Sequence, residues 1–265
     1  MFQLIAIMKT IHPTVSSKRL WALLLALPVT LSLALIHPAR AQTLTPLTAA
    51  EGDTPPAPWR VVGLPKTGKN LTRFDLVTLE GQRVLRISAD NSYANLVHEL
   101  PALALTPGTL LRWRWRLDQP LPLADLTRKS GDDVPVKVCV LFDMPLTSLG
   151  LVERNLVRLA RSLSHEYLPA ATLCYVWDNR LPVGTGLPNA FTRRVRYLVL
   201  NSGTSQLKQW VTHERDLAAD FQQAFGHEAA GILPPLVAIL VGADSDTTDG
   251  LSLAYASDLV LTRLP

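Results

Sequence analysis

The segment LLRWRWRL at residues 110–117 constrains the fold more than any other part of the chain. Side chains alternate between the two faces of a β-strand, so a strand here gathers tryptophans and leucines on one face and three arginines on the other. Apolar faces of sandwich strands pack inward. We therefore predict that Trp113 and Trp115 fill the space between two sheets. The alternative is a platform on which sugar rings stack.

The rest of the chain reads as a succession of short strands. Turn signals rich in Gly, Pro and Asn separate the strands, and two helical patterns interrupt them. The predicted strands lie at residues 59–65, 73–79, 83–88, 94–100, 109–117, 136–143, 172–178, 194–200, 209–215, 236–241 and 251–261, and the helices at 149–163 and 216–225. Alternating βα units are missing from this order. The predicted fold is all-β: an antiparallel jelly-roll β-sandwich with two short helical insertions.

Local turn chemistry refines this prediction at three points. Gly81 suits the turn of a hairpin between the runs 73–79 and 83–88. Pro101 is expected to end the strand that begins at residue 94. The turn-forming residues 201–203 predict that the strands on either side of them pair with each other.

The first 41 residues have the pattern of an export signal. Basic residues precede an uncharged apolar run at 20–36, and Ala39-Arg40-Ala41 offers the small-x-small motif that signal peptidases cleave. We predict a signal peptide at residues 1–41 and a periplasmic or secreted product. The alternative is an N-terminal membrane anchor that is not cleaved, because the length of the apolar run is near the lower limit for a membrane span.

Cleavage would change the charge of the chain. The full sequence has 26 Lys and Arg against 22 Asp and Glu, and the leader contains four of the basic residues and no acid. The remainder is formally neutral, whereas nucleic-acid binders keep a basic surplus. We therefore predict no nucleic-acid partner and no stable membrane span after cleavage. A flexible Pro-rich lead-in at 42–58 and a single sandwich domain at 59–265 complete the predicted organisation.

Basic side chains supply the predicted ligand-binding surface. Three guanidinium groups on one strand repel each other unless acids or anions lie nearby. If the strands carrying the other basic residues adjoin this one, a single sheet presents a basic stripe suited to a uronate or a sulfated glycan. The alternative is a solvated face held by cross-strand ion pairs. The predicted ligand-binding residues are Arg112, Arg114, Arg116, Lys137, Arg194 and Arg196.

Two strands share a pattern of Cys, two residues, an aromatic residue and Asp. In an oxidising compartment, Cys139 and Cys174 are expected to form a disulfide if the strands pair in a suitable register. Asp143 and Asp178 would then face a common groove, where two carboxylates could serve as the acid and base of a glycosidase. The alternative is that each Asp caps the turn after its own strand.

The loop GADSDTTDG at residues 242–250 clusters hard oxygen ligands. Asp244, Asp246 and Asp249 suit calcium, which needs additional oxygens from elsewhere, so a structural calcium ion is the one cofactor the sequence raises. Turn chemistry alone is the alternative. Outside these residues the sequence has no HExxH, GxSxG or GxGxxG motif.

The ordered segments WRVVGLP, NSYANLVHEL, LRWRWRL, GDDVPVKVCVLFD, CYVWDNRLPVG, RRVRYLVLNSG and GADSDTTDG resemble a family of exported bacterial proteins of unknown function. That resemblance covers residues 59–261 and implies no activity. LLRWRWRL, QWVTHERDL and LAYASDLVLTR are similar in arrangement to the galactose-binding-like jelly rolls of carbohydrate-binding modules. That resemblance implies a structural ion site at Asp258, and the helix at 149–163 departs from it.

Three hypotheses for function follow. The favoured one is a non-catalytic module that binds a glycan or a small anionic ligand. A polysaccharide hydrolase or lyase that uses Asp143 and Asp178 is the second. The third is a structural periplasmic protein whose polar faces only keep it in solution.

Overall fold

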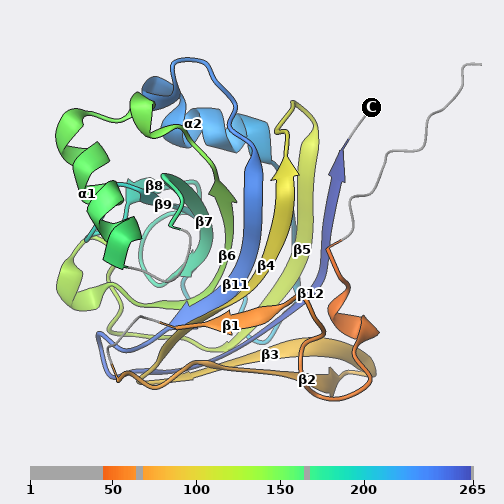
Figure 1. Ribbon diagram of the computed structural model, residues 1–265. Coiled ribbons are helices and arrows are strands. Elements are labelled where there is room, and N and C mark those ends of the chain that lie inside the picture. The colour runs from red at the N-terminus through yellow and green to blue at the C-terminus, as the bar shows by residue number, and fades with distance from the viewer. Residues whose placement is uncertain (1–43, 64–67, 164–167, 264–265) are drawn as a thin grey trace, which may run out of the picture. The chain divides into compact units, whose positions relative to one another are not determined.

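The computed structural model describes residues 44–63, 68–163 and 168–263, within a compact unit of residues His37–Pro265. The predicted signal peptide lies outside the described residues. Within these residues, twelve strands form two sheets that pack face to face (Figure 1). The predicted all-β sandwich is confirmed.

One sheet has seven strands in the order β1-β4-β11-β6-β7-β9-β8. These strands are β1 (Arg60–Val62), β4 (Tyr93–Leu103), β6 (Val134–Phe142), β7 (Ala171–Asp178), β8 (Gly186–Pro188), β9 (Val195–Ser202) and β11 (Leu236–Asp244). The other sheet has five strands in the order β10-β5-β12-β3-β2. Its strands are β2 (Arg73–Leu79), β3 (Gln82–Asp90), β5 (Thr109–Gln119), β10 (Val211–Asp216) and β12 (Leu251–Arg263).

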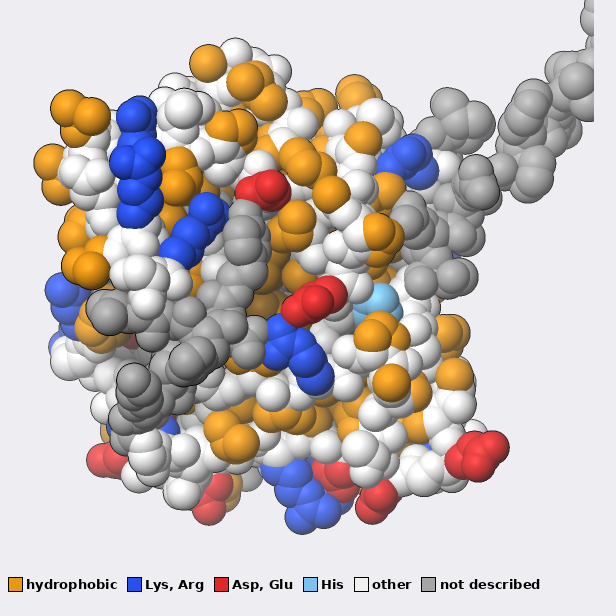
Figure 2. Space-filling view, viewed as in Figure 1, with side chains coloured by type: hydrophobic (Ala, Val, Ile, Leu, Met, Phe, Trp, Pro, Cys, Tyr) orange, Lys and Arg blue, Asp and Glu red, His pale blue; other side chains and the backbone are white. Residues whose placement is uncertain are grey.

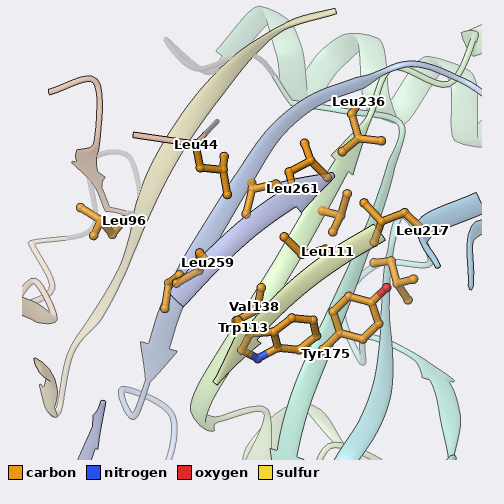
Figure 3. Packing of buried hydrophobic residues seen from close by; sticks show 14 of the residues in the cluster. Leu44, Leu96, Leu111, Trp113, Val138, Tyr175, Leu217, Leu236, Leu259 and Leu261 are labelled. Atoms are coloured by element: carbon orange, nitrogen blue, oxygen red, sulfur yellow. The ribbon is translucent and has the colours of Figure 1, made fainter. Parts of the chain in front are cut away.

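The core lies between the two sheets. Trp113 of β5 and Tyr175 of β7 face each other across it, with ring centroids 5.1 Å apart (Figure 3). Leu111 of β5 and Val138 of β6 belong to the same buried cluster. The alternation of apolar and polar residues along the strands therefore produces the two inward faces on which the sandwich depends.

The pairing differs from a purely antiparallel sandwich at one place. β7 and β9 are parallel, and the segment between them contains the three-residue strand β8, which pairs antiparallel with β9. The predicted pairing of the strands on either side of residues 201–203 is wrong. β10 joins β5 in the five-stranded sheet, because residues 203–210 carry the chain from one layer to the other.

The predicted hairpin at β2 and β3 is present. Its two-residue turn has positive φ angles at Glu80 and Gly81, as a type I′ turn requires. The predicted stop at Pro101 is wrong, since β4 continues to Leu103. Pro101 lies past the last residue that pairs with β1 and beside a register shift against β11, where its missing N–H interrupts no regular ladder.

In the described part of the chain, two α-helices accompany the sheets. Helix α2 (Leu217–Ala229) begins at Asp216, whose side chain accepts from two backbone N–H groups of the first turn, and Phe221 and Phe225 enter the core. It continues through Gly226, the predicted end. Helix α1 (Leu151–Leu163) follows the 3₁₀ turn Leu146–Ser148, and two further 3₁₀ turns span Leu47–Ala49 and Lys129–Gly131. Among the described residues, no helix is long and apolar enough to cross a membrane.

The lead-in predicted to be flexible packs against the sandwich over its described part. Leu44 and Leu47 are buried in the core cluster. Trp59 donates from Nε1 to the carbonyl of Thr45, and the backbone N–H of Thr45 donates to His98. Apolar residues between the prolines anchor this segment, which composition alone did not indicate.

Candidate ligand-binding site

Strand β5 shows the predicted alternation. Trp113 and Trp115 have no exposed surface, whereas Arg112 on the opposite face is exposed. The core interpretation of the tryptophans is therefore confirmed, and they offer no platform for a sugar ring.

Two of the three β5 arginines are neutralised within the chain. Arg114 Nε lies 2.6 Å from an Asp258 carboxylate oxygen. Arg116 lies 2.6 Å from carboxylate oxygens of both Glu80 and Asp118, and these hydrogen bonds raise its pKa although burial opposes them. The outer face of β5 therefore has the cross-strand ion pairs that we gave as the alternative to a ligand-binding surface.

The predicted continuous basic stripe is wrong, because its members lie on different sheets. β10 and β12 flank β5, whereas Lys137 lies on β6 and Arg196 on β9 in the seven-stranded sheet. Arg194 directly precedes β9 and is nearly buried. A single ligand therefore cannot follow all six predicted residues across neighbouring strands.

Lys137 is an internal partner of the acidic loop. Its Nζ lies 3.1 Å from Asp244 Oδ2, and Asp244 Oδ1 accepts from the backbone N–H of Val134 at 2.9 Å. Both side chains are buried. Burial raises the pKa of Asp244 to about 6, against the opposing effect of the Lys137 charge. A Cβ on neighbouring Gly242 would overlap Asn95 Oδ1 and lie 3.1 Å from Lys137 Cε, so these close approaches favour glycine there.

The loop at residues 242–250 is organised by a neighbouring carboxylate. Asp133 accepts from the backbone N–H groups of Thr247 and Thr248 at 3.0 and 2.7 Å. Asp246 lies 3.3 Å from Lys69 Nζ. These contacts come from residues that are distant in the sequence, so Asp133 and Asp246 have partners within the protein that local turn chemistry did not predict.

The structure does not bring the predicted calcium ligands together. Asp244 faces Lys137, and Asp258 lies on β12 in the other sheet beside Arg114. Within residues 44–63, 68–163 and 168–263, no group of three or more His, Cys, Asp or Glu side chains is placed to hold a metal ion. The predicted metal residues are Asp244, Asp246, Asp249 and Asp258, and calcium binding by the chain stays a prediction.

The predicted acid/base pair is also separated. β6 and β7 pair antiparallel with Phe142 opposite Ala171, which puts Asp143 and Asp178 at opposite ends of the strand pair. At about 3.3 Å per residue the carboxylates lie roughly 25 Å apart, whereas glycosidase pairs lie about 5–10 Å apart. Asp178 Oδ1 accepts from the N–H groups of Arg180 and Leu181 and so caps its turn. The alternation of side chains correctly places both residues on the same face of the sheet. It does not show that the antiparallel register puts them at opposite ends of the strands.

The same register aligns the two cysteines. Cys139 lies directly opposite Cys174, and a disulfide with an S–S distance of 2.07 Å joins them. The bond lies in a second buried cluster on the face of the sheet away from the main core.

A hollow of about 360 Å³ lies between β8, β9 and α2. Leu173, Leu187 and Leu198 contribute apolar surface to it, and Arg193, Arg196, Gln223 and His227 contribute donors. Ligand sites combine such apolar walls with a few placed polar groups, at volumes of about 300–1,000 Å³. Of the predicted ligand-binding residues, only Arg196 lines this hollow.

Arg196 is held in a fixed position. Its guanidinium donates to the carbonyl of Ala224 and to Glu228, and it lies 4.4 Å from the ring centroid of Phe225. Burial lowers its pKa, and the charges of Arg193 and Arg194 add to this effect. A guanidinium that is locked by its neighbours loses little entropy when it binds an anion.

Glu228 is shared between two guanidinium groups. It lies 2.6 Å from Arg194 Nη2 and also pairs with Arg196. Burial alone would raise its pKa, but the hydrogen bonds and charges of the two arginines outweigh burial and lower it. One carboxylate therefore serves two arginines, and Glu153 lies 3.4 Å from Arg194 as a weaker second partner.

Arg193 completes the basic wall of the hollow. It is exposed, and within the described part of the chain it forms no ion pair. His227, on the last turns of α2, has a side chain that is 64% exposed. The hollow thus presents one fixed guanidinium and one unpaired guanidinium close together.

Sequence reasoning missed Arg193, Gln223 and His227. The run RRVR at residues 193–196 was the available signal, but only the two arginines expected on the strand were considered. Gln223 and His227 are four residues apart and so share a helix face. The hollow itself could not be found because β8, with its Gly and Pro, is too short to show periodicity.

A sequence model of the family described as "Protein of unknown function (DUF3047)" matches residues 57–260. The chain belongs to this family. The match covers nearly all of the DUF3047 sandwich and agrees with the resemblance found in the ordered sequence segments. Among the curated proteins, none matches the chain at a significant level.

Solved structures that are weakly similar to this chain include the following two. TmCBM61, solved in complex with β-1,4-galactotriose, aligns at 10% identity with a TM-score of 0.32 and covers 78% of this chain and 90% of its own. Endoglucanase 3 of Trichoderma harzianum, from family GH12, aligns at 9% identity with a TM-score of 0.38 and covers 79% and 99%. At this level the likeness concerns the β-sandwich of the DUF3047 domain alone.

Proposed function

We propose that this chain is an exported, non-catalytic protein that binds a small anionic sugar in the hollow between β8, β9 and α2. The observation that carries the proposal is the pair Arg193 and Arg196 in one wall of that hollow, with Arg193 unpaired among the described residues. An anion between the two groups would relieve their mutual repulsion and accept charge-assisted hydrogen bonds from both.

The chemistry of the other lining residues supports a sugar as the anion's carrier. Gln223 can donate to or accept from hydroxyl groups, and the leucines can pack on the apolar face of a ring. Uronic and sulfated sugars share this combination of ring, hydroxyls and negative charge.

The test is calorimetric titration at low ionic strength with glucuronate, a sulfated glucose and neutral glucose. We expect the two anionic sugars to bind and glucose to bind at least tenfold more weakly. Arg193→Ala should weaken anionic binding by about 10–100-fold, since a hydrogen bond to a charged group contributes about 1.5–3 kcal/mol.

Arg112→Ala is the matched control, because it removes an arginine that is also exposed but lies in the other sheet. The Arg112→Ala variant should bind the anionic sugars with the same affinity as the unmodified chain. Equal losses in both variants would contradict the assignment to this hollow. Failure of all three sugars to bind would favour the structural-protein hypothesis instead.

A further inference from the structure

Helix α1 exposes most of its apolar side chains. Leu151 and Val152 are 74% and 75% exposed, and Leu156 and Leu159 are 59% and 56% exposed. Among its described side chains only Val157 is buried. At 3.6 residues per turn, Val152, Leu156 and Leu159 share one face, and Val157 lies on another.

The polar side of α1 faces the rest of the protein. Arg154 donates to the carbonyls of Leu146, Thr147 and Leu149, and Arg161 donates to that of Leu168. Glu153 lies 3.4 Å from Arg194. A helix on a soluble domain normally buries its apolar stripe against the core. The reversed orientation of α1 leaves that stripe for something outside the described chain.

The charges around this stripe are mainly positive. Arg154, Arg161 and Glu153 of α1 face the protein, which leaves Arg158 as the charged residue of the helix beside the stripe. Arg158 is exposed and forms no ion pair within the described segments. In the nearby 189–194 loop, Phe191 is 62% exposed with Lys129 Nζ 5.3 Å from its ring centroid. Figure 2 shows hydrophobic side chains along α1 at the left margin, with Lys or Arg side chains beside them.

We propose that α1 binds the surface of a lipid bilayer that contains anionic phospholipids. Its exposed apolar face would enter the boundary between headgroups and acyl chains, and Arg158 would lie among the phosphates. Helices that lie in this interface combine leucine-rich and arginine-bearing sides with low overall hydrophobicity. The helix would lie parallel to the surface, which is a different arrangement from spanning it.

A second copy of the chain is a poorer occupant of this face. The helix is about 20 Å long and about 10 Å wide. Such an area is well below the roughly 800 Å² that each partner buries in a stable dimer. A bilayer needs no such area, because each exposed side chain can enter it separately.

The test places a fluorescent NBD label on the full chain at Leu156→Cys, with Leu123→Cys as the matched control. Leu123 is 66% exposed and lies outside α1. With vesicles of phosphatidylcholine and phosphatidylglycerol, the label at 156 should shift its emission to the blue and be quenched by a lipid-phase quencher. The label at 123 should do neither. Because the label reports only on the surroundings of position 156, binding of the vesicle to another segment of the chain would not change its emission.

Charge and self-association complete the test. Arg158→Glu should weaken the response at position 156 about tenfold with the anionic vesicles and leave the melting curve unchanged, since basic residues are attracted to an anionic surface. A label at 156 that stays in water on vesicle-bound chain would overturn the proposal. So would a dimer, seen by sedimentation, that Leu156→Ser and Leu159→Ser dissociate.

Discussion

Replacing Lys137 with methionine removes the partner of a buried carboxylate. Asp244 is 5% exposed, and its Oδ2 lies 3.1 Å from Lys137 Nζ. Breaking a buried ion pair in this way typically costs about 3–5 kcal/mol. Protonation of Asp244 limits that cost. From an ordinary pKa of 3.8, at about 1.4 kcal/mol per pH unit, protonation costs about 5 kcal/mol near pH 7.5 but only about 2 kcal/mol near pH 5.

The free energy of unfolding of Lys137→Met should therefore fall below that of the unmodified chain by about 3–5 kcal/mol near pH 7.5, and by at most about 2 kcal/mol near pH 5. Urea denaturation followed by tryptophan fluorescence measures both values. The double variant Lys137→Met with Asp244→Asn removes both charges, so its stability does not follow the titration of Asp244. Because the raised pKa of Asp244 makes the unmodified chain lose stability as the pH rises toward 6, the deficit of the double variant should shrink slightly between pH 5 and pH 7.5 instead of growing. A single-variant deficit below about 1 kcal/mol near pH 7.5, or one equal at both pH values, would refute the reasoning.

Three further predictions concern stability. Replacing Cys139 and Cys174 with alanine should cost about 4 kcal/mol by the chain-entropy model for their separation of 35 residues, a loss that urea denaturation measures; an unchanged midpoint would contradict the model. Burial, aided by the Arg215 charge, lowers the pKa of His213 to about 4. The free energy of unfolding should therefore be highest above the ordinary pKa of 6.5 and should fall by about 1 kcal/mol, after allowance for solvent screening, as the pH falls toward 4. In melting curves recorded across this range, His213→Gln should reduce the dependence of the melting temperature on pH. Because Lys137, Lys69 and internal hydrogen bonds occupy the acidic loop, melting curves with calcium and with chelator should coincide; a rise in melting temperature with calcium would restore the metal hypothesis.

The strands were predictable because their signals are local. Alternation in residues 110–117 places Trp113 inside and Arg112 outside whatever lies beside the strand. The hairpin at Glu80 and Gly81 follows from turn chemistry in the same way. Asp216 caps α2 because its side chain reaches the N–H groups two and three residues ahead, again a local relation.

The site was not predictable, because it depends on which strands become neighbours. Alternation assigns a side chain to a face but does not say which sheet contains the strand, so Arg114 and Arg196 were grouped although different layers carry them. Alternation likewise places Asp143 and Asp178 on one face of the sheet. It does not show that the antiparallel pairing of β6 and β7 puts them at opposite ends of the strand pair. The wall of the hollow comes from β8 and α2, whose approach to β9 is a tertiary contact with no signature along the chain.

The most direct test of the account is a crystal structure of the protein soaked with glucuronate. We expect density for the sugar between β8, β9 and α2, with its carboxylate within hydrogen-bonding distance of Arg193 and Arg196. Density on the outer face of β5, beside Arg112, with an empty hollow would contradict it.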